Sequence, residues 1–284
     1  MMYDWRSLLF VPANNSARQD KALNIDADAI ILDMEDGVAP AAKAAARKGL
    51  REAARNLNEA DLPVIVRVNC GWRDLMADLE VAIDPSVQVL MLPKVEKPAH
   101  VMVITEMMAE FEAEHGMEVG STRLIVLIES PVGLQNISEI ARIDRVIGLA
   151  LGTEDFCLEL GVSPCPDVLD LPARQIAFAA AKRKQMALAI PISIAEFRDM
   201  EAYSSAAKLA VNFGVTGAIC IHPAQVKTIN DCFQSNVEAI ASAKAIIEKW
   251  NSAQSNGDAV TSLDGMMIDL PVVERAKAFL LKEK

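Results

Sequence analysis

Eight apolar runs of strand length, each followed by a segment long enough for a helix, constrain the fold of this chain more than any other feature. The runs are nearly continuously apolar, which is typical of parallel strands whose two faces are both covered. With 284 residues, the chain can hold one barrel of about 250 residues and an additional segment. We therefore predict an α/β fold, a (β/α)8 TIM barrel with a C-terminal helical extension. The runs are 7–12, 29–34, 64–69, 89–95, 124–129, 146–151, 188–193 and 218–222.

Two places in this pattern carry more specific local predictions. Asp170, followed by Leu171 and Pro172, fits a helix N-cap with a first-turn proline, which predicts a helix from there toward Met186. The strand expected at 188–193 contains Pro191, whose missing N–H removes one hydrogen bond from a sheet. The pattern supports this strand less well than the other seven.

The barrel pattern ends before the chain does. Residues 1–234 account for the eight strand and helix units, and we predict that they form a catalytic barrel with a magnesium site. Residues 235–284 have the pattern of a helix at 236–251, a polar linker at 252–257, a turn and a terminal helix from Pro271. Helices outside a closed barrel need an apolar surface to pack against. A neighbouring subunit would supply one, which predicts a homo-oligomer.

Composition narrows the classes of partner. The formal net charge of −11 argues against nucleic acid and against an anionic membrane surface. The five cysteines show no C-x-x-C spacing, so we expect neither a disulfide framework nor a zinc site. The N-terminal residues lack the pattern of a signal peptide, and no apolar run reaches the roughly 18 residues of a membrane span. We expect a cytoplasmic protein that binds a small molecule.

Carboxylates stand after two consecutive predicted strands. The run R-L-I-V-L-I-E ends in Glu129, and V-I-G-L-A-L-G-T-E-D ends in Asp155. Because the active site of such a barrel lies at the C-terminal ends of its strands, the two carboxylates could share one hard cation. We therefore predict that Glu129 and Asp155 bind Mg2+. Ordinary ion pairs with Arg67 or Lys94 are the alternative.

Further charged residues follow the neighbouring predicted strands. Arg67 lies inside the run V-I-V-R-V-N, where a cation requires an anion, which could be a protein carboxylate or a substrate carboxylate. Asp33, Glu35 and Asp36 follow the second run, and they could position Arg67 and the metal waters or only cap the next helix. Lys94 could be a Schiff-base nucleophile, but carboxylates around it would keep it protonated and favour charge balance.

These residues belong to a series of short motifs that extends through nearly the whole chain. Each motif is weak alone, but their succession is specific, and through it the chain resembles the citrate lyase β-subunit-like branch of the HpcH/HpaI aldolase family. The motifs are R-S-L-L-F-V-P (6–12), I-L-D-M-E-D-G-V (31–38), V-R-V-N (66–69), L-P-K-V (92–95), I-E-S-P-V-G (128–133), L-G-T-E-D-F (151–156), I-H-P-A-Q (221–225) and D-G-M-M-I-D-L-P-V-V (264–273).

The resemblance implies a barrel that is usually trimeric, here a homotrimer or a dimer of trimers. It implies Mg2+ at Glu129 and Asp155, and a CoA thioester as substrate, so that CoA enters as part of the substrate. Arg67 matches an arginine that binds the substrate carboxylate or oxyanion. Asp269 matches an aspartate that is brought into the site of a neighbouring subunit as acid/base.

Further assignments follow from the same resemblance. We expect Glu35 and Asp36 to support catalysis beside Arg67, and Arg6, Pro12 and Lys94 to contribute to substrate binding.

Three positions depart from the motifs of the family. Ala13 replaces a glycine, and Ala218 and Met266 replace lysines. Losing two cations changes how the chain would hold CoA.

We therefore expect a Mg2+-dependent carbon–carbon lyase of the retro-Claisen type. It would cleave a short 3-hydroxy-carboxyacyl-CoA, such as (S)-citramalyl-CoA or malyl-CoA, to acetyl-CoA and a 2-oxo acid, pyruvate or glyoxylate. Two alternatives stay open at this point. One is a malyl-CoA-type thioesterase on the same scaffold, which would release free CoA. The other is a non-catalytic or acyl-carrier-dependent citryl lyase subunit.

Overall fold

The chain folds into two compact units, Met1–Phe233 and Gln234–Lys284. A computed structural model describes residues 3–234, 237–255 and 260–282.

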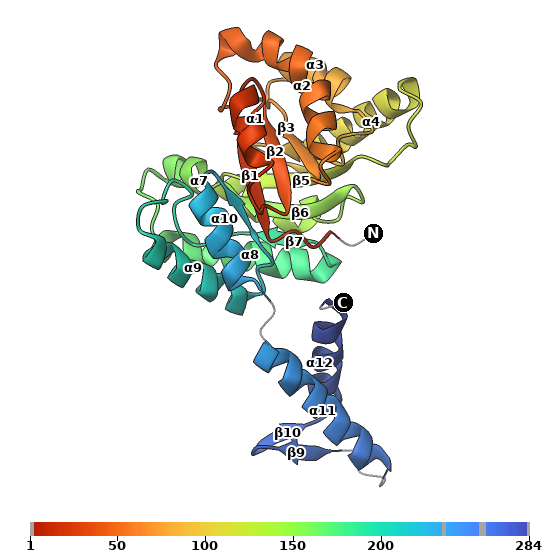
Figure 1. Ribbon diagram of the computed structural model, residues 1–284, viewed down its shortest axis with the longest axis vertical. Coiled ribbons are helices and arrows are strands. Elements are labelled where there is room, and N and C mark those ends of the chain that lie inside the picture. Colours follow the sequence, from red (N-terminus) through yellow and green to blue (C-terminus); the bar gives the residue numbers. More distant parts are fainter. Residues whose placement is uncertain (1–2, 235–236, 256–259, 283–284) are drawn as a thin grey trace. The chain divides into compact units, whose positions relative to one another are not determined.

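Eight parallel strands form the sheet of the first unit (Figure 1). Each strand pairs in parallel with its neighbour in the order β7-β6-β5-β4-β3-β2-β1-β8, as expected for a barrel. The strands are β1 (Ser7–Pro12), β2 (Ala29–Asp33), β3 (Val64–Arg67), β4 (Val89–Leu92), β5 (Arg123–Ile128), β6 (Val146–Leu151), β7 (Met186–Leu188) and β8 (Ala218–Cys220).

The two ends of this order meet through a short parallel bridge between Leu188 and Gly217. The amides of Thr216 and Gly217 both donate to the carbonyl oxygen of Ala187, over 2.9 and 3.2 Å. Gly217 is required here because a Cβ at this position would lie 2.3 Å from the carbonyl oxygen of Arg6. The bridge nearly closes the sheet into the predicted (β/α)8 barrel, and the fold prediction is confirmed.

The strands are apolar on both faces because each face meets a different layer. On β2, Ile31 belongs to the cluster that fills the barrel interior, whereas Ile30 and Leu32 belong to the cluster between strands and helices. Side chains of a strand alternate between its two faces, so both faces must be apolar when both are buried.

Helices follow the strands and supply the outer layer. In α2, buried Ala46, Leu50, Ala54 and Leu57 recur at helical spacing and form one apolar face. The helices of the first unit are α1 (Ser16–Ala22), α2 (Lys43–Asn58), α3 (Trp72–Ala82), α4 (Pro98–Glu114), α5 (Pro131–Gln135), α6 (Ile137–Ile140), α7 (Thr153–Leu160), α8 (Pro166–Arg183), α9 (Met200–Phe213) and α10 (Pro223–Cys232), with a 3-10 turn at Pro40–Ala42.

Two local predictions were wrong. Helix α8 begins at Pro166 rather than after Asp170, and Pro172 lies inside it. The buried face of α8, which includes Leu169, Ala173 and Ile176, outweighs the hydrogen bond that Pro172 cannot donate. Strand β7 ends at Leu188, where the predicted strand began, so Pro191 lies in the segment after the strand.

The second unit combines two helices with a hairpin, α11 (Val237–Ser255), β9 (Thr261–Leu263), β10 (Met266–Ile268) and α12 (Leu270–Lys282). Strands β9 and β10 pair antiparallel. Asp264 and Gly265 between them both have positive φ, 49° and 81°. An Asp-Gly pair at these angles is the usual two-residue hairpin turn. The predicted polar linker at 252–257 lies partly in α11, and its residues 256 and 257 are outside the described residues.

Within the described ranges, none of the helices combines the length and the apolar character that crossing a membrane would require.

Candidate functional site

A cavity of about 380 Å3 lies at the C-terminal ends of the barrel strands. Four strands place charged groups around it, because each group stands at the end of its strand or in the residues that follow. The residues that line it include Pro12 at the end of β1, Asp33 at the end of β2 and Asp36 beyond it, Arg67 at the end of β3, Glu129 after β5, and Glu154 and Asp155 after β6, at the start of α7.

Arg67 is held within the protein by a carboxylate of the neighbouring strand. Its Nε and Nη2 atoms donate to the two carboxylate oxygens of Asp33, both over 2.7 Å, and its Nη1 lies 3.3 Å from Oε2 of Glu35. The guanidinium also lies 4.6 Å from the ring centre of Phe10. A bidentate pair of this kind fixes both position and orientation. The anion that pairs with Arg67 in this structure is therefore a protein carboxylate, that of Asp33, which was one of the two partners expected from the sequence.

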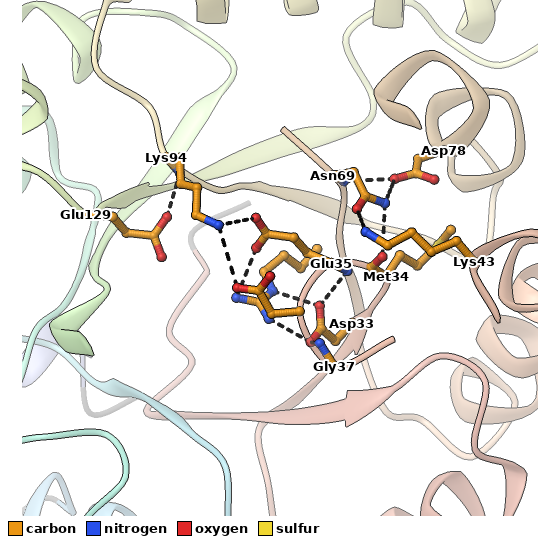
Figure 2. A network of polar contacts seen from close by, with 11 residues as sticks. Asp33, Met34, Glu35, Gly37, Lys43, Asn69, Asp78, Lys94 and Glu129 are labelled. Atoms are coloured by element: carbon orange, nitrogen blue, oxygen red, sulfur yellow. Dashed lines mark hydrogen bonds and ion pairs between the residues drawn. The ribbon is translucent and has the colours of Figure 1, made fainter. Parts of the chain in front are cut away.

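Asp33 also shapes the backbone that follows β2. Its two oxygens accept from the amides of Glu35 and Gly37, over 2.9 and 2.8 Å (Figure 2). Gly37 leaves room for this contact, since a Cβ there would lie 2.3 Å from Oδ2 of Asp33. Asp33 thus caps a turn and orients Arg67 at the same time. From the sequence, positioning of Arg67 and capping were alternatives for this residue.

Lys94 connects two of the carboxylates. Its backbone adopts a positive φ of 54°, which is rare for a residue with a side chain. In this conformation its amide donates to Oε2 of Glu129 over 2.5 Å, while its Nζ donates to Oε1 of Glu35 over 2.9 Å (Figure 2). Asp36 lies 3.6 Å from the same Nζ. Burial lowers the pKa of Lys94, but Glu35 and Asp36 outweigh this effect and hold the pKa above its usual value. Lys94 is therefore protonated, which suits charge balance and not Schiff-base chemistry.

Glu129 lies buried among like charges. Burial raises its pKa most; the hydrogen bond from the Lys94 amide opposes this, and Glu35 and Asp155 add to it, so that the pKa reaches about 7. Gly152 packs directly against this side chain. A Cβ at this position would lie 2.4 Å from Cγ of Glu129, so there is no room for a larger residue. A divalent cation between Glu129 and Asp155 would relieve the repulsion.

The carboxylates of Glu129 and Asp155, which line the same cavity, are a pair of ligands suited to the predicted Mg2+. Among the residues that the structure describes, no group of three or more His, Cys, Asp and Glu side chains could hold a metal ion. Two carboxylates suit Mg2+, which keeps several waters and completes its shell with substrate oxygens.

Arg6 does not join these residues. It precedes β1, at the opposite end of the barrel, where Nε and Nη2 donate to the two carboxylate oxygens of Asp28 over 2.9 and 2.8 Å. Its side chain ties the start of β1 to the residue before β2. The prediction that Arg6 binds substrate is wrong for a substrate in this cavity, because the cavity lies beyond the other end of the strand.

Asp269 belongs to the second unit. It follows β10 and precedes α12, where its Oδ1 accepts from the amide of Val272 over 3.2 Å and caps the helix. Its carboxylate is partly exposed.

Sequence reasoning missed a second polar network next to the site. The side-chain amide of Asn69 donates to the carbonyl oxygen of Met34 over 2.9 Å and to buried Asp78 over 2.6 Å (Figure 2). Lys43 donates to Oδ1 of Asn69. Met34 lies between Asp33 and Glu35, so this network holds the turn that carries both acids. The signal in the sequence was Asp78, a carboxylate on the otherwise apolar face of α3.

Residues 6–223 match the family described as HpcH/HpaI aldolase/citrate lyase. Citrate lyase subunit beta of Haemophilus influenzae is 31% identical, over 98% of this chain and 97% of that protein. L-malyl-CoA/beta-methylmalyl-CoA lyase of Rhodobacter capsulatus is 29% identical, over 97% of this chain and 93% of that protein. The structure of protein CitE from Mycobacterium tuberculosis, in complex with magnesium, acetoacetate and coenzyme A, superposes with a TM-score of 0.77. It is 28% identical and covers 99% of both chains. The chain belongs to the HpcH/HpaI aldolase/citrate lyase family.

Proposed function

We propose that the protein is a Mg2+-dependent carbon–carbon lyase that cleaves a short 3-hydroxy-carboxyacyl-CoA to acetyl-CoA and a 2-oxo acid. The observation that carries the proposal is the cavity in which Glu129 and Asp155 face the same space as Arg67. Magnesium, when bound by these two carboxylates, would supply Lewis acidity and a positive charge at the hydroxyl and carboxylate oxygens of the substrate.

Arg67 has the fixed orientation that stabilisation of developing charge needs. Asp33 holds two of its nitrogens, so little reorganisation is required when an oxyanion forms beside it. Glu35 and Asp36 bind Lys94 and place a second cation near the same carboxylates. Pro12, which lines the cavity, and Lys94, which lines a second pocket, would contact the substrate. The acids around Lys94 keep its charge in place.

Asp269 would transfer the proton, supplied by the second unit of a neighbouring copy. Its carboxylate would remove the proton from the substrate hydroxyl, and the oxygen electrons would form the new carbonyl group. The bond between C2 and C3 would break, leaving its electron pair on C2 as the enolate of acetyl-CoA. Asp269 would then return its proton to C2. A homotrimer is the assembly that we propose for this exchange of units.

A product assay tests this function. Purified protein is incubated with citramalyl-CoA or malyl-CoA, with Mg2+ or with EDTA, and the 2-oxo acid and free thiol are followed separately. We expect oxo acid in the presence of Mg2+ only, with acetyl-CoA persisting. Free thiol without oxo acid would instead indicate a thioesterase. Turnover of neither ester, despite Mg2+ binding, would favour an accessory or acyl-carrier-dependent subunit.

Substitution of a metal ligand sharpens this assay. We expect Asp155→Ala to lower kcat/KM at least about 100-fold, because one of two protein ligands is lost. The matched control is Asp231→Ala, which removes an exposed carboxylate of α10 whose ion pair, among the described residues, is with Lys227. Full activity of Asp155→Ala with Mg2+ would show that the metal site lies elsewhere.

A further inference from the structure

A further cavity, of about 430 Å3, lies at the other end of the barrel from the candidate site. Arg123 is the first residue of β5 and Val146 the first of β6, whereas Glu129 and Asp155 follow the opposite ends of these strands. At about 3.3 Å per residue, a strand of six residues separates the two cavities by about 20 Å. We call this cavity the basic hollow. Its lining residues are Tyr3, Arg123, Ile143, Asp144, Val146, Ile147, Arg183, Lys184 and Gln185.

Cations outnumber acids in the basic hollow, although the whole chain carries a formal net charge of −11. Arg123, Arg183 and Lys184 line it together with one acid, Asp144. The side chain of Asp144 is fully exposed, and its Oδ1 lies 3.6 Å from Nη2 of Arg183. An exposed pair at this distance contributes little, so the excess of two positive charges is open to an anion.

Arg123 is the partly buried cation of this group. Its Nη2 donates to the backbone carbonyl oxygen of Asp144 over 2.5 Å, which orients the guanidinium without neutralising it. Among the residues that the structure describes, neither Arg123 nor Lys184 forms an ion pair. A guanidinium that is held in place without a carboxylate is available to pair with a bound anion.

The end of α8 contributes the other two cations. Lys184, which follows the helix, has a positive φ of 56°. The amides of Lys184 and Gln185 donate to the carbonyl oxygens of Ala181 and Ala180, over 3.2 and 3.0 Å. This turn satisfies two of the carbonyl oxygens that a helix leaves without partners, and so it reduces their repulsion of an anion. The same turn carries Arg183 and Lys184 into one lining with Arg123.

The rest of the lining is largely apolar. Tyr3 and Ile147 pack against the cluster that fills the barrel interior, and Ile143 packs against the cluster between strands and helices. The ring of Tyr3 lies edge-on to that of Trp5, with ring centres 4.9 Å apart. A volume of about 430 Å3 is typical of a pocket for a small molecule rather than for a single ion. The lining therefore suits a molecule with one strongly anionic end and a less polar remainder.

We propose that the basic hollow binds a small organic phosphate. A phosphate monoester carries about 1.5 to 2 negative charges at pH 7, which matches the excess of two positive charges, whereas a monocarboxylate would leave one cation uncompensated. Arginine suits phosphate because its planar guanidinium donates in pairs to the phosphate oxygens. The phosphate would contact Arg123, Arg183 and Lys184, and the organic part would lie against Tyr3 and Ile147. This site is separate from the proposed reaction and does not rest on it.

Calorimetric titration with AMP as the probe tests the proposal. We expect saturable binding with a Kd below about 1 mM. Adenosine lacks the phosphate and should bind at least about tenfold more weakly, and inorganic phosphate should also bind more weakly, because it lacks the organic part. Absence of saturable AMP binding would overturn the site. Equal affinities for AMP and inorganic phosphate, or for AMP and adenosine, would overturn the proposed class of ligand.

Two substitutions locate the binding site. Arg123→Gln and Arg183→Gln each remove one charged donor, and we expect each to weaken AMP binding at least about tenfold. Arg183→Gln keeps the test decisive if Arg123→Gln fails to fold. Arg55→Gln is the matched control, since Arg55 is also an exposed arginine in the last turn of a helix, here α2, and should leave AMP affinity unchanged. Wild-type affinity in Arg183→Gln, or an equal loss in Arg55→Gln, would contradict the proposal.

A variant at the opposite end of the barrel tests whether AMP binds there instead. Arg18 is an exposed cation of the candidate-site cavity. We expect Arg18→Gln to bind AMP as tightly as wild type does. Weaker binding in Arg18→Gln, with wild-type affinity in Arg183→Gln, would place the phosphate at the candidate site and overturn the proposal.

Discussion

In the candidate site, the carboxylate of Glu129 has a strongly raised pKa. Its carboxylate is buried, accepts a hydrogen bond from a strained backbone amide and has like charges for neighbours. A group in this environment favours its neutral form until a cation arrives. Its protonation should therefore be linked both to folding and to metal binding.

The metal-free protein should lose stability as pH rises. The pKa of Glu129 is raised from 4.5 to about 7 in the folded state. A raised pKa stabilises the fold below the unfolded value, and this contribution disappears as pH rises through the folded value. With EDTA present, the free energy of unfolding of wild type relative to Glu129→Gln should fall between pH 4.5 and pH 7, by at most about 3 kcal/mol. Denaturant unfolding across this range measures it.

Mg2+ should reverse this trend, because in the proposed site it would bind the ionised carboxylate of Glu129. The increase in Tm that Mg2+ produces should therefore grow as pH rises toward 7. Glu154→Gln is the control, since it removes an exposed carboxylate of the same cavity and should retain the pH dependence of wild type. A wild-type pH dependence in Glu129→Gln would contradict the assigned cause.

Residue-level prediction succeeded where a strand end dictates position. Asp33, Arg67, Glu129 and Asp155 were expected at one end of the barrel, and the structure brings them around one cavity. Arg6 is the first residue of the motif R-S-L-L-F-V-P, but it precedes strand β1, so the geometry of the barrel places it at the other end. The sequence could not reveal the left-handed backbone of Lys94, because only the surrounding fold imposes it.

At the scale of elements, the errors come from proline and from short strands. Pro172 is a common first-turn residue, but Pro166 already fills that position in α8, and the buried face extends across both. Strand β7 has three residues, so its hydrophobic pattern is too short to predict where the strand begins and ends. Neither error moves the site, because its charged residues follow β2 to β6.

The turn between β6 and α7 gives a prediction at this scale. Gly152 has φ and ψ of −87° and 91°, so it does not need the positive φ that favours glycine, and the three atoms nearest to a Cβ there all belong to Glu129. We expect Gly152→Ala to displace the Glu129 carboxylate and to weaken Mg2+ binding about 10- to 100-fold. Calorimetric titration with Mg2+ measures this.

Gly71→Ala is the matched control for this turn. It also precedes a helix, and a Cβ there meets nothing within 4 Å. Wild-type Mg2+ affinity in Gly152→Ala would show that the glycine does not shape the metal site.

For the whole molecule, the barrel accounts for every charged residue of the cavity, but not for Asp269. This aspartate lies in a compact unit of its own, beside the exposed side chains of Met267 and Leu270. Apolar side chains around a proposed acid/base group favour a surface that another copy of the chain could cover. The proposed exchange of units can therefore be tested by mixing variants that are substituted in different units.

Complementation between two inactive variants tests it. We expect Asp155→Asn to inactivate the barrel part of the site and Asp269→Asn to inactivate the part supplied by the second unit. If each site combines a barrel with the second unit of another copy, random assembly of equal amounts of the two variants pairs an unsubstituted barrel with an unsubstituted second unit at about one quarter of the sites. We then expect about one quarter of wild-type activity. Co-expression with separate affinity tags, followed by the product assay, measures this fraction.

A doubly substituted chain, co-expressed with wild type, provides the control for that experiment. Sites shared between copies should then again give about one quarter of the activity, whereas sites within one chain should give about one half. No recovery in the first mixture, together with about one half in the second, would place Asp269 in the site of its own chain. The two mixtures thus distinguish an Asp269 supplied by a neighbouring copy from an Asp269 that acts in the site of its own chain. The distinction does not depend on which ester is the substrate.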